Sequence, residues 1–259
     1  MTQLEKLLYL NKILLEESPI YQEQAKQFTN TKQEQYQLFR SLLNLRSPGG
    51  VSEAFLKVQD EFLQQEMDEK GVVTLQQLEP IEPDIYLWKG DITRLAVDGI
   101  VNAANDALLG CFVPCHGCID NAIHSAAGIQ LREECNQLMQ QQGHREQTGI
   151  AKITPAYNLP SNYVLHTVGP IIYGELTEKD CELLRSCYRA CLELALENQL
   201  QSIAFCCIST GEFHFPNDKA SEIAVTTVKE ILSNTNHKIK VVFNVFKEID
   251  YRLYKELLG

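Results

Sequence analysis

The chain has 259 residues, 44% of them hydrophobic, so it can bury a sizeable core as one large domain or as a domain with an appendage. Asp and Glu number 34 against 23 Lys and Arg, and the formal net charge of −11 disfavours nucleic acid as a partner. Nine cysteines, with no secretory signal pattern at the start, predict a reducing, cytoplasmic location. No apolar stretch approaches the roughly 20 residues that cross a bilayer, so we expect no membrane span.

Residues 1–75 have the apolar spacing of amphipathic helices. The spacing is clearest at residues 4–13, 36–43 and 55–63. A Ser-Pro-Gly-Gly sequence at residues 47–50 ends the second helix, and Ser52 is placed to cap the third. Nothing in this region suggests chemistry. We therefore predict a helical N-terminal extension over residues 1–75 that docks on a second domain over residues 76–259.

After residue 80, short apolar runs alternate with helical stretches. The apolar runs predict buried strands at residues 85–88, 99–101, 151–154, 163–167, 203–208 and 239–246. Helical patterns lie at residues 120–142, 178–198, 217–233 and 248–258. The alternation predicts an α/β fold in which a mostly parallel sheet lies between layers of helices. Ligands of such sheets bind outside the carboxyl ends of the strands, so the loops there are the places to search for a site.

Four potential metal ligands lie within eight residues, at Cys111, Cys115, His116 and Cys118. Thiolates and imidazoles suit zinc, and a structural zinc site fills four protein positions whereas a catalytic one keeps one position open. The spacing is not that of a standard zinc finger, and no second Cys/His cluster follows. From these residues alone a metal site and ordinary buried thiols are equally open, and Cys115 is not distinguished from the other thiols.

Two more loops that follow predicted strands have suggestive residues. Asn102 and Asn105 end the strand at residues 99–101, where short amides either bind sugar hydroxyls or simply turn the chain. Residues 209–216, Ser-Thr-Gly-Glu-Phe-His-Phe-Pro, follow the strand at 203–208, and small residues there let successive backbone N–H groups face an anion. The alternative for this second loop is an ordinary connection with Phe213 and Phe215 in the core.

Seven motifs in order resemble the macrodomain family. They include Ile-Val-Asn-Ala-Ala-Asn at residues 100–105 and His-Thr-Val-Gly-Pro at 166–170, and the resemblance covers roughly residues 80–258. It implies a three-layer α/β/α fold with a mixed, mostly parallel sheet, and ADP-ribose as ligand. Hydrolase-type macrodomains have a glycine run where this chain has residues 111–118. The replacement is similar to the zinc-dependent bacterial branch associated with sirtuin-type ADP-ribosyltransferases.

The resemblance also implies roles for individual residues. It implies Zn²⁺ as cofactor, with Cys111, His116 and Cys118 as ligands and Cys115 left out. The ADP-ribose-binding residues that it implies are Asp91 and Ile92 for adenine, Ser209, Thr210, Gly211, Glu212 and Phe213 for the diphosphate, and Asn105 and Phe215 for the distal ribose. Asp120 matches the catalytic acidic position, beside Asn105. His124, one helical turn from Asp120, is expected to be a packed, hydrogen-bonded structural residue.

Three functions are open at this point. The first is a zinc-dependent hydrolase that removes mono-ADP-ribose from a modified, acidic side chain of a protein. The second is a reader that binds ADP-ribose without turnover, and the third is a macrodomain with a purely structural zinc. A three-ligand metal and Asp120 favour the hydrolase, because a reader needs neither. We expect a monomer whose partners are ADP-ribose and a mono-ADP-ribosylated protein. Loss of residues 1–70 is expected to lower stability more than metal binding.

Overall fold

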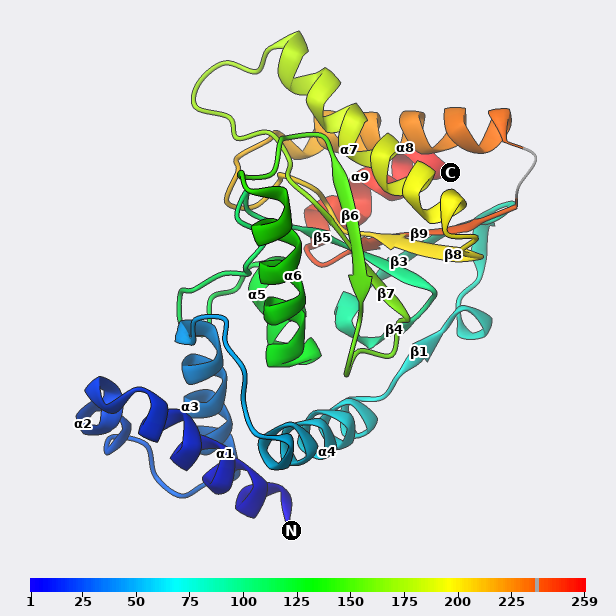
Figure 1. The fold of residues 1–259 in the computed structure, drawn as a ribbon. Helices are drawn as coiled ribbons and strands as arrows, with labels where there is room; N and C mark the ends of the chain where they lie inside the picture. Colours follow the sequence, from blue (N-terminus) through cyan, green and yellow to red (C-terminus); the bar gives the residue numbers. More distant parts are fainter. Residues whose placement is uncertain (236–237) are drawn as a thin grey trace.

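A seven-stranded sheet lies at the centre of the computed structural model, which describes residues 1–235 and 238–259 (Figure 1). In these residues the strand order is β2-β3-β9-β8-β5-β7-β6. The strands are β2 (Pro80–Glu82), β3 (Ile85–Lys89), β5 (Gly99–Ala103), β6 (Ala151–Pro155), β7 (Tyr163–Thr167), β8 (Ser202–Phe205) and β9 (Lys240–Val245). β2 and β6 are antiparallel to their neighbours, and the five inner strands are parallel. β1 (Val73–Thr74) and β4 (Leu95–Ala96) form a separate parallel pair.

Helices cover both faces of the sheet (Figure 1). α7 (Glu178–Glu197), α8 (Asn217–Asn234) and α9 (Glu248–Leu258) pack together on one face, and α5 (Ile119–Ala127) and α6 (Ile129–Gln142) lie on the other. Strands buried on both sides are apolar throughout, and Ile100, Val101, Val242 and Phe243 are completely buried here. The predicted α/β/α fold with a mixed, mostly parallel sheet is confirmed.

The N-terminal extension is helical, as predicted, and has a hydrophobic core of its own. It consists of α1 (Gln3–Glu17), the short α2 (Gln22–Ala25), α3 (Lys32–Leu45) and α4 (Glu53–Lys70), shown in blue to cyan in Figure 1. Phe39, Phe55 and Phe62 lie at the centre of this core. The Ser52 side chain accepts a hydrogen bond from the backbone N–H of Phe55, so the predicted cap of α4 is confirmed. α2 was not predicted.

Two predicted elements differ from the structure for identifiable reasons. The helix expected over residues 120–142 is two helices, because the chain breaks at Gly128, whose φ is +91°. A Cβ atom at Gly128 would lie 2.7 Å from Gln59 Nε2 of α4, so glycine permits both the turn and the close approach of the extension. The strand expected over residues 203–208 ends at Phe205, because Cys206 and Ile208 are buried as part of the following loop instead of the sheet.

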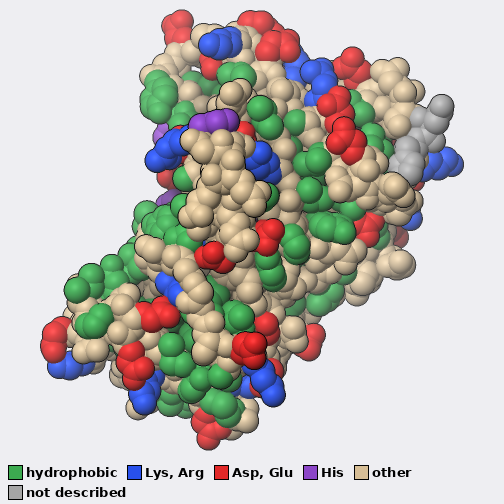
Figure 2. Space-filling model, viewed as in Figure 1, with side chains coloured by type: hydrophobic (Ala, Val, Ile, Leu, Met, Phe, Trp, Pro, Cys, Tyr) green, Lys and Arg blue, Asp and Glu red, His purple; other side chains and the backbone are tan. Residues whose placement is uncertain are grey.

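The surface carries mixed charge. On the face shown in Figure 2, Lys and Arg side chains lie scattered among Asp and Glu side chains, and the extension forms the narrower lobe at the lower left. None of the helices in the described part of the chain has the length and apolar character needed to cross a membrane.

Candidate active site

The predicted site residues lie in loops at one edge of the sheet. β3, β5 and β8 belong to the parallel set, so their carboxyl ends meet at the same edge. Residues 90–94 follow β3, residues 104–118 follow β5, and residues 206–216 follow β8. This is the edge where parallel α/β sheets bind their ligands.

Cys111, His116 and Cys118 come together in the loop after β5. Their ligand atoms all lie within 4.8 Å of one another, and Cys111 Sγ lies 3.6 Å from His116 Nδ1. Tetrahedral zinc with bonds of about 2.0–2.3 Å keeps its ligands about 3.3–3.8 Å apart, so the three side chains fit one ion after a small adjustment. Burial is the largest cause that raises the pKa of the Cys118 thiol to about 12, and a bound cation acts in the opposite direction. We call residues 111–118 the metal loop.

Cys115 points away from this cluster. Its Sγ lies 3.3 Å from Ser41 Oγ and 3.5 Å from the carbonyl oxygen of Gln37, both on α3. Its backbone has a φ of +51°, in a left-handed region that residues other than glycine and asparagine rarely adopt. The geometry therefore separates Cys115 from the other three residues, which the spacing alone did not.

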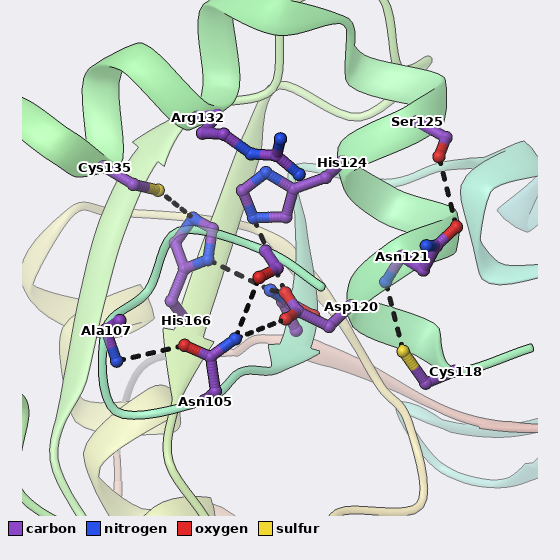
Figure 3. Close-up of polar contacts among 12 residues, drawn as sticks. Asn105, Ala107, Cys118, Asp120, Asn121, His124, Ser125, Arg132, Cys135 and His166 are labelled. Atoms are coloured by element: carbon purple, nitrogen blue, oxygen red, sulfur yellow. Dashed lines mark hydrogen bonds and ion pairs between the residues drawn. The ribbon is translucent and has the colours of Figure 1, made fainter. Parts of the chain in front are cut away.

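Asp120, at the start of α5, is buried and holds two asparagine side chains (Figure 3). Asn102 Nδ2 donates to its Oδ1 at 2.8 Å, and Asn105 Nδ2 donates to its Oδ2 at 3.1 Å. Asn105 also donates to the carbonyl of Gly110 at 3.0 Å, which fixes the amide at the entrance of the metal loop. Burial raises the pKa of Asp120 to about 6, and the bond from Asn102 opposes this rise. Asp120 and Asn105 thus form one unit.

His124 is packed, but the hydrogen bonds expected for it are not present. Its Nε2 lies 3.5 Å from Asp120 Oδ1, outside hydrogen-bonding geometry, and neither ring nitrogen has a hydrogen-bond partner in residues 1–235 and 238–259. Burial lowers the pKa of His124 well below its ordinary value, so the ring is neutral. The helix spacing placed His124 beside Asp120 correctly, whereas its hydrogen bonding was predicted wrongly.

The loop after β8 has free backbone donors. The N–H groups of Gly211, Glu212 and Phe213 have no partner within the described residues, and Ser209 adopts a φ of +65°. Thr210 instead donates its hydroxyl to the carbonyl of Cys207 at 3.0 Å. Three successive unpaired N–H groups are suited to an anion such as a diphosphate.

Glu212 of this loop lies near the metal loop. Its Oε1 lies 3.7 Å from Nε2 of His116, on the opposite side of the ring from Nδ1, which faces Cys111. At this distance the carboxylate makes no hydrogen bond, but it lies on the side of the ring where a carboxylate can accept from the nitrogen of a ligating histidine that does not face the metal. Nδ1 is the ring nitrogen that faces Cys111, so it is the one that would hold a cation shared with that thiol.

The other residues predicted to bind ADP-ribose differ in how far their side chains are exposed. Asp91 is half-buried, and its Oδ1 accepts bonds from the N–H and the hydroxyl of Thr93, so that it caps the short helix η3 (Ile92–Arg94). The side chain of Ile92 lies in the core, which leaves only its backbone for a ligand. Phe215 is 1% exposed, so its ring has a packing role here and contact with a ribose would require the loop to move. Phe213 is half-buried beside the core.

Three residues that support the site were not among the predicted site residues. Asn102 is completely buried and bonds both Asp120 and His166. Arg40 and Asn44 of α3 bond the metal loop across more than 70 residues of sequence. The Asn-Ala-Ala-Asn motif was a signal for Asn102, whereas no local pattern marks Arg40 or Asn44.

Comparison with known proteins agrees with this architecture. The Macro domain profile matches residues 101–224. The chain is 53% identical to a protein-ADP-ribose hydrolase of Treponema medium, over 100% of both chains. It is 49% identical to a protein of the same name from Staphylococcus aureus (strain MSSA476), over 85% of this chain and 84% of that one. A macrodomain of Trypanosoma brucei, solved in complex with ADP-ribose, matches 85% of this chain and 95% of its own with a TM-score of 0.67 and 34% identity. The chain belongs to the macro domain family.

Proposed function

We propose that this chain is a zinc-dependent hydrolase that removes mono-ADP-ribose from a modified side chain of a protein. Two relatives named protein-ADP-ribose hydrolase support this class of reaction. The observation that carries the zinc dependence is the cluster of Cys111, His116 and Cys118 beside the anion-binding loop. An acidic linkage, and a sirtuin-type transferase as the source of the modification, remain predictions from the resemblance.

In this proposal the residues of the site divide into binding and positioning groups. Asp91 binds the adenine, and the free N–H groups of the loop after β8 bind the diphosphate. Asp120 fixes the amide of Asn105, and in the proposal this carboxylate accepts a proton from the attacking water while Asn105 borders the distal ribose. Zinc, when bound, supplies Lewis-acid chemistry at this edge of the sheet.

The test uses substrate proteins with ADP-ribose on defined aspartate, glutamate or arginine side chains, with and without chelator. We expect release from the acidic linkages, and we expect Cys118→Ala to abolish both turnover and zinc content. Cys115→Ala should retain both, because its thiol faces α3. Asp91→Ala is the control that weakens ADP-ribose binding while zinc content stays normal.

Two outcomes would contradict the proposal. Zinc-loaded protein that binds ADP-ribose but releases none from any of these linkages would be a reader. Equal loss of zinc in Cys115→Ala and Cys118→Ala would indicate a closed four-ligand site and a structural metal.

A further inference from the structure

We infer that α3 of the N-terminal extension is a structural part of the metal centre, with Arg40 and Asn44 as positioning residues for the metal loop. The inference rests on the proposed metal site. The metal loop contains neither helix nor strand, and side chains from outside the loop bond its backbone. Two of those side chains, Arg40 and Asn44, come from α3.

Arg40 ties α3 to the metal loop and to α5 at once. Its guanidinium donates to the backbone carbonyl of His116 at 3.0 Å, and it donates twice to Asn121 Oδ1, at 2.7 and 3.2 Å. The planar fork of arginine fixes several acceptors in one geometry, which a lysine ammonium does not. The carbonyl of a proposed ligand is therefore held by a side chain from the extension.

Asn121, which Arg40 holds in place, bonds the metal loop at Val113 and at Cys118. It is completely buried, and its Nδ2 donates to the carbonyl of Val113 at 2.9 Å. Its backbone N–H donates to Sγ of Cys118 at 3.4 Å, and Ser125 donates to its Oδ1 (Figure 3). Because Arg40 and Ser125 share the same oxygen of Asn121, the amide has one orientation, the one that binds the loop.

Asn44 holds the middle of the metal loop. Its Oδ1 accepts the backbone N–H of Cys115 at 2.8 Å, and its Nδ2 donates to Ser125 Oγ at 3.0 Å. Asn44 is 1% exposed, so neither bond competes with solvent. Cys115 has a left-handed backbone, which costs free energy unless surrounding contacts impose it. The hydrogen bond that the Cys115 N–H donates to Asn44 and the packing of the Cys115 thiol on α3 supply those contacts.

The other domain in turn anchors α3. Arg132 of α6 is buried, and its Nη1 donates to the carbonyls of Leu43 and Asn44 at 2.9 Å each, at the C-terminal end of α3. These carbonyls would otherwise lack partners, since a helix leaves its last carbonyls unsatisfied. The position of α3 is thus fixed relative to the metal loop. We therefore expect loss of the extension to weaken zinc binding as well as to lower stability.

The test measures zinc affinity by chelator competition in the full chain without substrate. Outer-shell partners of metal ligands typically contribute about 10–100-fold to affinity, and we expect Arg40→Ala to weaken zinc binding by that factor. Arg40→Lys keeps the charge but not the fork, and should give a smaller loss. In cobalt-substituted protein, the absorption bands of Arg40→Ala should shift, because the ligands are held less uniformly.

Two control variants distinguish positioning from general destabilisation. Lys57→Ala removes an exposed cation from α4 of the extension, and Leu14→Ala loosens its core away from the metal loop. Both should bind zinc as the unaltered chain does, because neither side chain makes a hydrogen bond or ion pair to the metal loop in residues 1–235 and 238–259. Unchanged affinity in Arg40→Ala, or an equal loss in Leu14→Ala, would overturn the inference. If the unaltered chain binds no zinc, the proposed function itself fails, which is a different result.

Discussion

At the scale of single residues, the polar groups around Asp120 determine the protonation of a buried histidine. Asn102 Nδ2 donates to Asp120 and also lies 3.2 Å from Nδ1 of His166, so this ring nitrogen must be an acceptor. The ring proton is therefore on Nε2, which donates to Thr154 Oγ1 at 3.0 Å. Burial lowers the pKa of His166 to about 4, so the ring is neutral at physiological pH.

This neutral histidine predicts a specific loss of stability in acid. In the unfolded chain His166 has an ordinary pKa near 6.5, so as the pH falls from 6.5 toward 4 the unfolded state takes up a proton that the folded state does not. The free energy of unfolding should fall by about 2 kcal/mol between pH 7.5 and pH 5 from this group alone. Urea unfolding at these two pH values, with chelator present, measures this difference in the free energy of unfolding.

The matching variant is His166→Gln, which cannot take up the proton. It will be less stable at every pH because it loses packing, but its stability should depend less on pH over this interval. The same dependence in both proteins would show that His166 does not remain neutral on folding.

At the scale of elements, the loops that follow β7 and β8 pack closely against each other where Gly169 meets Ser209. A Cβ atom at Gly169 would lie 2.0 Å from Oγ of Ser209 and 2.9 Å from Cγ2 of Ile208. The hydroxyl of Ser209 is buried, so it has no free space into which to retreat. The absence of a side chain at Gly169 thus permits the start of the loop after β8 to lie against it.

Gly169→Ala should therefore displace the start of this loop. Overpacking of this kind costs about 1–3 kcal/mol, and we expect both thermal stability and ADP-ribose affinity to fall. Gly174→Ala is the matched control, because it lies in the same connection and has no atom within 4 Å of the added Cβ. Calorimetry with ADP-ribose and thermal melts give the two readouts. Equal affinity in the two variants would show that the loop tolerates the methyl group.

At the scale of the whole molecule, two hydrophobic cores are joined by buried polar contacts. The core of the extension and that of the sheet are separate clusters. Gln59 Oε1 of α4 accepts the backbone N–H of Ile129 at 3.1 Å, and Asn158 Nδ2 donates to Asp60 Oδ1 at 2.7 Å. Such contacts couple the two cores, so we expect one cooperative unfolding transition.

Trp88, the only tryptophan of the chain, lies in β3 and reports on the sheet alone. Phe62→Ala empties a site in the core of the extension, where Phe62 contacts Phe39 at 5.5 Å between ring centroids, and should cost about 3–5 kcal/mol. If the cores unfold together, the urea concentration at the midpoint of the Trp88 fluorescence transition should fall by the amount that this loss of stability predicts. Phe246→Ala, which removes a phenylalanine that is 74% exposed, should leave it unchanged. A Trp88 midpoint unaffected by Phe62→Ala would show two independent units.

Local patterns in the sequence were sufficient for most of the fold and for part of the site. Apolar runs located the strands, since both faces of a parallel sheet are buried, and amphipathic spacing located α1, α3 and α4. The motifs also placed Asn105, Asp120 and the metal loop at the carboxyl ends of strands, where the structure has them. These features depend on neighbours a few residues apart, which a sequence displays directly.

The tertiary structure decided what depends on distant partners. Cys206 and Ile208 are buried in a loop and not in a strand. Gln59, far away in the sequence, approaches Gly128 so closely that no side chain fits there. Neither contact is local. Cys115 differs from the other thiols of the metal loop only because it faces α3. Arg40 lies 76 residues from His116, in a helix whose own pattern shows only that one face is apolar. A polar side chain acquires its partner only when packing brings two segments together, so its role is absent from the local sequence around it.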